Sequence, residues 1–454
     1  MIRRSLVLAL AAALSPMAAQ AADLLQVYEM ARNGDPQLAS AESTRLYNKE
    51  GQVQARAALL PQLNGSASLS RTNSKFDDPV GTLTRKSRQY EIKGSQTLFN
   101  WSQFANLRAQ RDLSKAADFT IDSANDDLIV RTSAAYFNVL VGIESLAAAE
   151  TNEAAGKKQF DYADKRLEVG LAPITDVHEA RAEYDQARAN TILARNQLKD
   201  AYQALTELTG QPVIDLRGLP EEWRPELPAQ YANVDEMVSN AVADNPSLKA
   251  QELRVNAAES SVSAARGGHY PTLSLGGSWG KGATWGDSTG SASVDPDDTN
   301  TIGVTLSVPI FAGGATQSQV RQALAQRDIE QDSLEQQKRA LDRNTRNAYQ
   351  TLVAGISEVE ARRLTVVSSQ AAFDASQVGL EVGTRTVLDV VQNQRTLFQA
   401  QVEYVRARYQ FLQNRLLLAQ ATGKLDIDDL QFINRMLTAN AASRLQNPAD
   451  SLNQ

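Results

Sequence analysis

The sequence contains no cysteine and only two histidines, His178 and His269, among 454 residues. Without cysteine the chain forms neither a disulfide framework nor a lipid anchor on an N-terminal cysteine. Two imidazoles and no thiolate argue against a transition-metal site. No nucleophile, metal or cofactor motif points to an enzyme, so neither enzymatic activity nor a cofactor is expected.

Long apolar runs are also missing. No run beyond the N-terminus approaches the ~18 apolar residues of a membrane-spanning helix. The formal net charge is −7, which argues against a nucleic-acid partner. Proline is absent from 101–169 and from 314–382, so each stretch of 69 residues can form one very long helix.

The N-terminus has the form of a secretory signal peptide at 1–21. Arg3 and Arg4 precede a short apolar stretch at 6–14, and 19–21 reads Ala-Gln-Ala, a typical cleavage site. The mature chain is expected to begin at Ala22. The formal charge then becomes −9, because two arginines and no acidic residue leave with the signal.

The most informative positive feature is an internal repeat. Three pairs of similar segments stand 213 positions apart: 136–143 and 349–356, 169–177 and 382–390, and 208–210 and 421–423. Such long-period repetition indicates a tandem duplication of one unit of ~210 residues. The expected organisation is a first repeat at 22–210, an irregular linker at 211–235, a second repeat at 236–423, and a C-terminal segment at 424–454. The tail after Ala439 is expected to be disordered.

Each repeat combines helical and strand patterns. In the first, Asp35 and Pro36 begin a helix that is expected to end near Leu60. Alternating stretches at 63–69 and 90–98 predict two strands, separated by a polar, turn-rich segment at 73–87. A long helix at 101–169 and a returning helix at 174–209 follow.

The second repeat has the same order: a helix after Pro246, strands at 273–279 and 302–310, a long helix at 314–382 and a returning helix at 386–422. A long helix would span ~100 Å, whereas a returning helix spans ~54 Å and the preceding short helix ~38 Å. We therefore expect the two shorter helices to stack end to end beside the long one.

Four strands per chain are too few for a closed barrel, which needs ~8. Open edges in a bilayer would leave backbone groups unpaired. If these are membrane strands, several chains must pool them, and three chains supply twelve.

The residues now described resemble the TolC family of outer-membrane channel-tunnel proteins, from Ala22 to about Leu437. The most specific stretches are 133–140 (SAAYFNVL), 166–177 (RLEVGLAPITDV) and 382–390 (VGTRTVLDV). The resemblance implies an α+β, mostly α fold: a trimeric twelve-stranded outer-membrane β-barrel continued by a long periplasmic α-helical coiled-coil barrel. It also implies a passive exit duct for drug efflux or type I protein secretion. Its partners would be outer-membrane lipid, a periplasmic adaptor and an inner-membrane efflux pump or ABC transporter.

The resemblance also indicates functional residues at the expected tunnel tip. Asp389 would form an acidic ring at the entrance, or it simply favours the N-terminal dipole of its helix. The family's second aspartate is here Gln392. Arg385, Thr175 and Asp176 match positions that lock the tip closed, although they also suit ordinary surface charges. The tyrosine partner in that lock is replaced by Leu380.

The two helical turns, Val169, Gly170 and Leu171 and then Val382, Gly383 and Thr384, match the docking site of the adaptor. Plain turn chemistry also accounts for their glycines. Trp279, Trp285 and Tyr90 suit the membrane interface or an ordinary loop. The competing function is an exported coiled-coil structural protein or adhesin without channel activity, for which lipid-facing strand alternation would have no use.

Overall fold

The computed structural model describes residues 22–75, 82–226, 233–286 and 294–445. The chain divides into two compact units, which are described separately. The first unit takes its described residues from 22–40, 122–245 and 338–445, and the second from 41–121 and 246–337. Among the described residues, no helix combines the length and the apolar character needed to cross a bilayer.

The order of elements repeats once along the chain. The helices are α2 (Leu24–Gly34), α3 (Pro36–Ala57), α4 (Trp101–Glu168), α5 (Ile174–Thr209), α6 (Val234–Asp244), α7 (Pro246–Gly267), α8 (Ala315–Glu381), α9 (Val387–Ala421), α10 (Ile427–Met436) and the 3₁₀ helix η2 (Ala441–Arg444). The strands are β1 (Gln62–Lys75), β2 (Thr82–Phe99), β3 (Arg217–Gly218), β4 (Thr272–Gly286), β5 (Val294–Ser307) and β6 (Ala439–Asn440). The long helices α4 and α8 have 68 and 67 residues, close to the expected 69.

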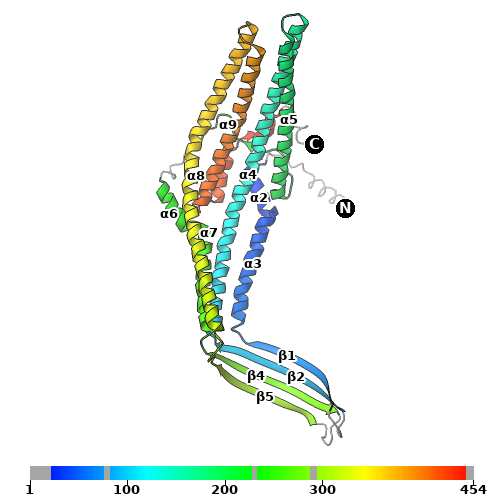
Figure 1. The fold of residues 1–454 in the computed structure, drawn as a ribbon, viewed down its shortest axis with the longest axis vertical. Helices are drawn as coiled ribbons and strands as arrows, with labels where there is room; N and C mark the ends of the chain where they lie inside the picture. The colour runs from blue at the N-terminus through cyan, green and yellow to red at the C-terminus, as the bar shows by residue number, and fades with distance from the viewer. Residues whose placement is uncertain (1–21, 76–81, 227–232, 287–293, 446–454) are drawn as a thin grey trace, which may run out of the picture. The chain divides into compact units, whose positions relative to one another are not determined.

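The second unit contains one antiparallel sheet in the order β1-β2-β4-β5 (Figure 1). Strands β2 and β4 each have a neighbour on both sides. Strands β1 and β5 each pair on one side only, so within the described residues the sheet has two open edges.

The register separates the side chains of this sheet into two faces. Leu63 lies opposite Gly94, Ile92 opposite Trp279, and Leu275 opposite Val304, so all of these share one face. The apolar face consists of Leu63, Ala67, Leu69, Tyr90, Ile92, Leu273, Leu275, Trp279, Ile302, Val304 and Leu306. The opposite face consists of small polar and charged residues, including Asn64, Ser66, Ser68, Glu91, Lys93, Ser278 and Thr301. The sheet is thus apolar on one side and polar on the other.

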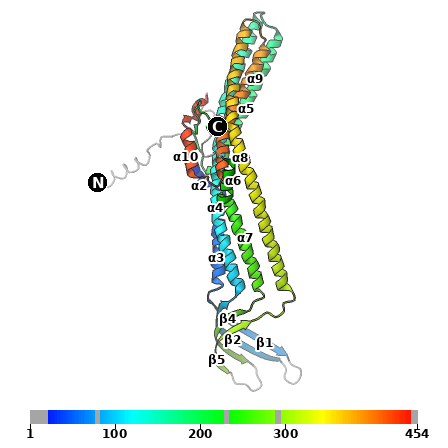
Figure 2. The same cartoon turned by 90° about the vertical axis from the view of Figure 1, so that its left-hand side faces the viewer.

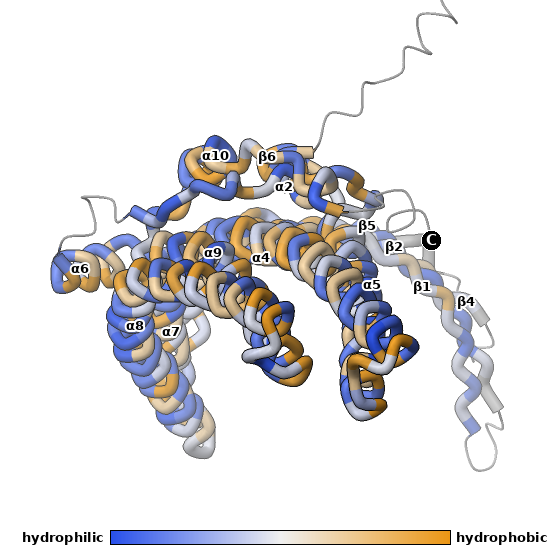
Figure 3. Tube along the Cα trace, turned by 90° about the horizontal axis from the view of Figure 1, so that it is seen from above, coloured by the Kyte–Doolittle hydropathy of each residue, from blue (hydrophilic) through white to orange (hydrophobic). Residues whose placement is uncertain are grey.

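The first unit contains the parts of two helical hairpins that lie nearest their turns (Figure 1). One hairpin is formed by α4 and α5, and the other by α8 and α9. Helices α2 and α10 and the β3–β6 pair lie against one side of these helices (Figures 2 and 3). We call this set of elements the belt. Its apolar side chains, among them Leu24, Leu430 and Ile433, share one buried core with α4 and α9.

A buried carboxylate fixes the belt to the hairpins. The Tyr409 hydroxyl of α9 donates to Glu144 Oε1 of α4 at 2.6 Å, and Arg444 Nη1 of the belt lies 3.0 Å from Glu144 Oε2. Burial raises the pKa of Tyr409 well above its usual value. The Tyr136 hydroxyl donates in turn to the Arg217 carbonyl at 2.8 Å. Belt, α4 and α9 are therefore held together by polar as well as apolar contacts.

Residues just before the short helices α3 and α7 lie against the ends of the returning helices. Gly34 approaches the end of α5 so closely that an added Cβ would lie 2.5 Å from the Thr209 carbonyl oxygen. In the second repeat, Asn245 Nδ2 donates to the carbonyls of Gln420 and Ala421 at the end of α9. Both contacts lie within the first unit, and the end-to-end stacking of the whole helices stays a prediction.

Several expected boundaries are wrong. The strands extend into the predicted turn-rich segment 73–87, since β1 and β2 stay paired as far as Lys75 and Thr82. Val308 and Ile310 lie beyond the end of β5, and α3 ends at Ala57 rather than near Leu60. Cross-strand hydrogen bonding outweighs local polarity in the first case, because a ladder continues for as long as its partner strand does.

The segments outside the repeats are more ordered than predicted. The linker 211–235 contributes β3, and the tail expected to be disordered after Ala439 forms β6 and η2 as far as Arg444. Ala441, Ala442 and Leu445 of this tail are buried. Residues 446–454 and the predicted signal peptide at 1–21 lie outside the described residues. Helix α2 was not predicted, and its burial against the belt core explains why it forms.

Candidate functional site

The two hairpins end in turns of the same backbone construction. In the first, the N–H of Gly170 donates to the Leu167 carbonyl at 2.9 Å, and that of Leu171 donates to Arg166 at 2.8 Å. In the second, Gly383 donates to Leu380 at 3.2 Å, and Thr384 donates to Gly379 at 2.8 Å. The glycines have φ of +73° and +77°. Each turn is a Schellman motif, in which glycine relieves the strain of the left-handed conformation.

Apolar side chains project from both turns into solvent. Val169, Leu171 and Ile174 are exposed in the first turn, and Val382 and Leu388 in or beside the second. A Cβ added at Gly170 or Gly383 would meet no neighbouring atom within 4 Å. The expected docking residues therefore present a small, accessible apolar surface at the end of each hairpin. Thr384 differs, because its hydroxyl donates back to the Gly379 carbonyl at 3.2 Å.

Asp389 is engaged in capping helix α9. The backbone N–H and the hydroxyl of Thr386 both donate to Asp389 Oδ2 at 2.9 Å, and the N–H of Asp389 donates to the Thr386 hydroxyl at 3.2 Å. This reciprocal pattern is a capping box. The hydrogen bonds from Thr386, its backbone N–H first and its hydroxyl second, lower the pKa of Asp389. The carboxylate stays charged and is half-buried, and one of its oxygens accepts the hydrogen bonds that cap the helix.

Asp176 occupies the matching position in helix α5 but does not take part in a capping box. The residue before α5 is Pro173, which makes no side-chain cap hydrogen bond. Proline also lacks the N–H that the Asp176 carboxylate would accept in a capping box. Thr175 and Asp176 lie in the first turn of α5, with Thr175 exposed and Asp176 half-buried. Within the described residues, the Asp176 carboxylate therefore makes no capping hydrogen bond, whereas one oxygen of Asp389 is engaged by Thr386.

Arg385 lies against its own turn. Its Nη1 is 3.9 Å from Asp389 Oδ1, and its aliphatic stem covers Gly379. Within the described part of this single chain, Arg385 forms no hydrogen bond or ion pair with Thr175 or Asp176. The predicted lock involves contacts between neighbouring chains, so it stays a prediction.

Leu380 is buried in an apolar cluster that joins the two hairpins. Ala163 and Val177 of the first hairpin meet Leu380, Val387 and Val390 of the second, and Phe160, Leu167 and Phe373 surround them. Leu380 is only 7% exposed. The leucine that replaces the family's tyrosine therefore contributes packing where a hydroxyl would contribute a hydrogen bond.

Sequence reasoning missed four polar residues that also join the hairpins. Gln394 Nε2 donates to the carbonyl and to the side-chain Oδ1 of Asn152, both at 3.0 Å. Arg395 Nη2 lies 2.6 Å from Glu183 Oε2. The sequence did offer one indication of the Glu183 contact, because this acid stands in the buried stripe of α5 between Ala180 and Ala187. An acid within such a stripe needs a partner.

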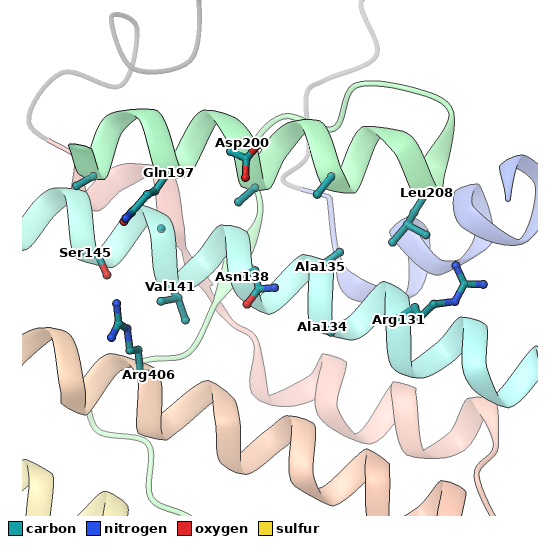
Figure 4. Close-up of a pocket in the computed structure, with 14 residues that line it drawn as sticks. Arg131, Ala134, Ala135, Asn138, Val141, Ser145, Gln197, Asp200, Leu208 and Arg406 are labelled. Atoms are coloured by element: carbon teal, nitrogen blue, oxygen red, sulfur yellow. The ribbon is translucent and has the colours of Figure 1, made fainter. Parts of the chain in front are cut away.

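A shallow pocket of about 520 Å³ lies between α4 and α5, with Arg406 of α9 at its margin (Figure 4). Ala134, Asn138, Val141 and Ser145 line it from α4, at spacings of three and four residues. This stripe lies on the opposite side of α4 from Tyr136, whose hydroxyl contacts the belt. The helices thus present a polar and small-residue surface away from the belt.

Comparisons with known proteins agree with this geometry. The family model described as "Outer membrane efflux protein" matches residues 27–211 and again 237–424, once in each repeat. The chain is 33% identical over 438 residues to outer membrane protein TolC of Escherichia coli (strain K12), covering 95% of this chain and 88% of that one. It is 28% identical to the alkaline protease secretion protein AprF of Pseudomonas aeruginosa, covering 90% and 86%.

Solved structures show the same fold. The structure of CusC superposes with a TM-score of 0.75 at 19% identity, covering 88% of this chain and 92% of that one. The expected fold class, a mostly helical chain built on a tandem duplication with a small sheet, is therefore confirmed.

Proposed function

Because the chain belongs to the outer membrane efflux protein family, we propose that three copies assemble into one passive exit duct through the outer membrane. The family confirms the expected outer-membrane location and export-channel function. It is a family of channels and not of enzymes. We propose the trimeric assembly, the partner proteins and the roles of the residues at the entrance.

The two-faced, open sheet is the observation that carries the proposal. Strands β1 and β5 each leave one edge unpaired, and an unpaired edge in lipid costs several kcal/mol per backbone group. Pairing β5 of one chain with β1 of the next removes every edge, and three chains close twelve strands. The apolar face from Leu273 to Trp279 spans about 20 Å at the usual rise, near the ~25 Å band of outer-membrane barrels. It faces lipid, and the polar face lines the lumen.

The aromatic and charged residues mark one boundary of this band. Tyr90 and Trp279 lie on the apolar face, and the next pair along it, Lys281 and Asp298, forms an ion pair at 3.4 Å. Aromatic side chains at the headgroup level followed by charges are typical of a membrane interface. Trp285 lies further along the same face.

The hairpin ends are the proposed periplasmic entrance. Val169, Gly170, Leu171, Val382, Gly383 and Thr384 receive a periplasmic adaptor, which couples the duct to an inner-membrane efflux pump or ABC transporter. Arg385 binds Thr175 and Asp176 of a neighbouring chain and holds the entrance closed, and three copies of Asp389 form its acidic ring. The cargo is drugs, secreted proteins or both, and one relative, AprF, is named for the secretion of an alkaline protease.

The assembly is tested by mass in detergent. Light scattering that subtracts the detergent should give three chains per particle, and a stable monomer or dimer would overturn the barrel.

Two neighbouring substitutions test which face of the sheet meets lipid and which lines the lumen. Ile302→Lys on the apolar face should cost ~2–4 kcal/mol of barrel stability near the bilayer centre, whereas Thr301→Lys on the polar face should be tolerated. Equal losses would contradict the assignment of lipid and lumen.

An exported scaffold or adhesin does not explain the two-faced sheet. Such a protein has no need for an apolar face on strands, and the family match covers both repeats.

A further inference from the structure

Two neighbouring residues of α9 reach across to the other hairpin and bind both of its helices. Gln394 holds Asn152 of α4 through two hydrogen bonds, and Arg395 holds Glu183 of α5 at 2.6 Å. The carboxylate of Glu183 is 4% exposed, and the guanidinium of Arg395 is 50% exposed. Asn152 and Gln394 are buried as well.

We propose that the Arg395–Glu183 and Gln394–Asn152 contacts form a latch within each chain that holds the two hairpins together while the entrance is closed. We call these four residues the inner latch. Arg395 lies ten residues beyond Arg385, or about 15 Å further along the helix. The inference rests on the proposed gating of the hairpin ends, and it assigns part of the closing force to contacts inside one chain.

The chemistry suits a contact that must break and re-form. Hydrogen bonds and charge pairs require short distances and good angles, so a small separation of the hairpins abolishes them. The apolar cluster around Leu380 is less directional and tolerates sliding. The inner latch therefore gives the hairpins two discrete arrangements, bound and released.

Separation of the hairpins does not leave either charged side chain buried without a partner. Arg395 is already half in solvent, and separation of the helices would expose Glu183 to water, where an ionised carboxylate is stable. The pair therefore favours the closed state without making it permanent. It also provides, between the hairpins, a polar contact of the kind that Leu380 cannot make.

A matched control exists in the same bundle. Arg195 of α5 lies 3.3 Å from Glu150 of α4, with exposures of 42% and 9%. Its chemistry is the same, but it joins two helices of a single hairpin. Loss of this pair removes an arginine–glutamate contact without releasing one hairpin from the other.

The first test compares single-channel conductance in planar bilayers for wild type, Arg395→Ala, Gln394→Ala and Arg195→Ala. Arg395→Ala should raise the open-to-closed ratio by about tenfold, the scale of one lost charge-assisted hydrogen bond, with an unchanged yield of trimer. Arg195→Ala should leave the ratio unchanged. The charge exchange Glu183→Arg with Arg395→Glu should restore closure. Equal effects of Arg395→Ala and Arg195→Ala, or no rescue by the exchange, would overturn the latch.

The second test does not depend on the stability of a weakened variant. Because the chain has no cysteine, Glu183→Cys with Arg395→Cys can be joined by a short bifunctional maleimide without background reaction. Cross-linking should abolish opening, whereas joining Glu150→Cys with Arg195→Cys should leave it intact. Normal opening of the cross-linked channel would overturn the latch.

The outcomes separate this inference from the proposed function. If the wild-type trimer conducts and Arg385→Ser opens it, the gated duct stands whatever Arg395→Ala does. If the trimer does not conduct at all, the proposed duct itself fails.

Discussion

The turn of the first hairpin and the turn of the second share a backbone but not a cap. Both are Schellman motifs with glycine at positive φ, and Gly170 and Gly383 stand 213 residues apart, as do Asp176 and Asp389. Helix α9 starts with a capping box between Thr386 and Asp389, whereas α5 starts after a proline without a side-chain cap. The duplication therefore preserved the turn geometry and changed the use of the acid beside it.

This difference changes which residues can act between chains. Asp389 has one oxygen committed to Thr386, so its freedom to bind another group is limited. Asp176 has no such commitment, which suits it to accept a hydrogen bond from Arg385 of a neighbouring chain. In the proposed lock, one repeat supplies the acceptor, and the other supplies an arginine just before the capped start of α9.

The largest effect is expected from breaking that contact. Arg385→Ser should open the entrance, because a threefold tip loses three sets of bonds together, each bond worth ~1 kcal/mol. We expect higher single-channel conductance and greater vancomycin sensitivity, with a normal yield of trimer. Leu380 has already removed one bond, so the gain should be modest. Conductance identical to that of wild type would show that this arginine does not hold the closed state.

A smaller effect is expected from exchanging the caps. Thr386→Ala should destabilise the first turn of α9 by about 1 kcal/mol, since it removes the hydroxyl of the capping box. Pro173→Thr should create such a box with Asp176 and stabilise α5 by less, because the proline restriction on the unfolded chain is lost. Hydrogen exchange of the first turns of α5 and α9 is the measurement. Equal exchange in Thr386→Ala and wild type would mean that the box contributes nothing.

The smallest effect is expected on ion selectivity. Asp389→Ala should weaken cation preference and block by polyvalent cations, since Gln392 leaves Asp389 without a second acid. Asp176→Ala is the matched substitution in the other repeat and should change selectivity less. Reversal potentials in planar bilayers compare the two. Equal shifts, or none, would leave Asp389 as a helix cap alone.

The wild-type Asp389 carboxylate gives cation preference a defined pH dependence. The pKa of Asp389 is lowered from 3.8 in the folded chain. Its charge, and the stability that the cap derives from it, are therefore complete above pH 3.8 and are lost as pH falls through the lower folded value. Cation preference should stay constant between pH 7 and 5. A decline within that range would require a different titrating group.

The repeated pattern made much of the architecture predictable. Proline-free stretches of 69 residues with apolar residues at helical spacing predicted very long helices, and α4 and α8 follow them to within two residues. Alternation at Leu63–Leu69 and at Leu273–Trp279 identified the strands, because the two faces of a sheet meet different surroundings. Helix lengths predicted that the shorter helices stack end to end, but they did not indicate that Gly34 and Asn245 contact the ends of α5 and α9.

The belt and the inner latch depended on tertiary contacts. The tail 439–445 is short and mixes small, polar and apolar residues, so no local pattern marks it as folded. It is ordered because β6 pairs with β3 and because Arg444 meets the buried Glu144, some 300 residues earlier in the chain. The partner of Glu183 was equally hidden, since Arg395 lies on a different hairpin.

The sequence by itself therefore determined the duplication, the helix and strand types, the positions of the turns and the family. These follow from local periodicity and backbone chemistry, which depend on neighbours within a few residues. The cap of α9 is also local, because the hydroxyl and carboxylate that form it stand three residues apart at Thr386 and Asp389. Only the tertiary structure decided that Leu380 is buried. It alone showed that Gln394 and Arg395 bind the other hairpin. Which side chains meet across helices depends on the rotation and register of packed elements, and short-range pattern does not encode these.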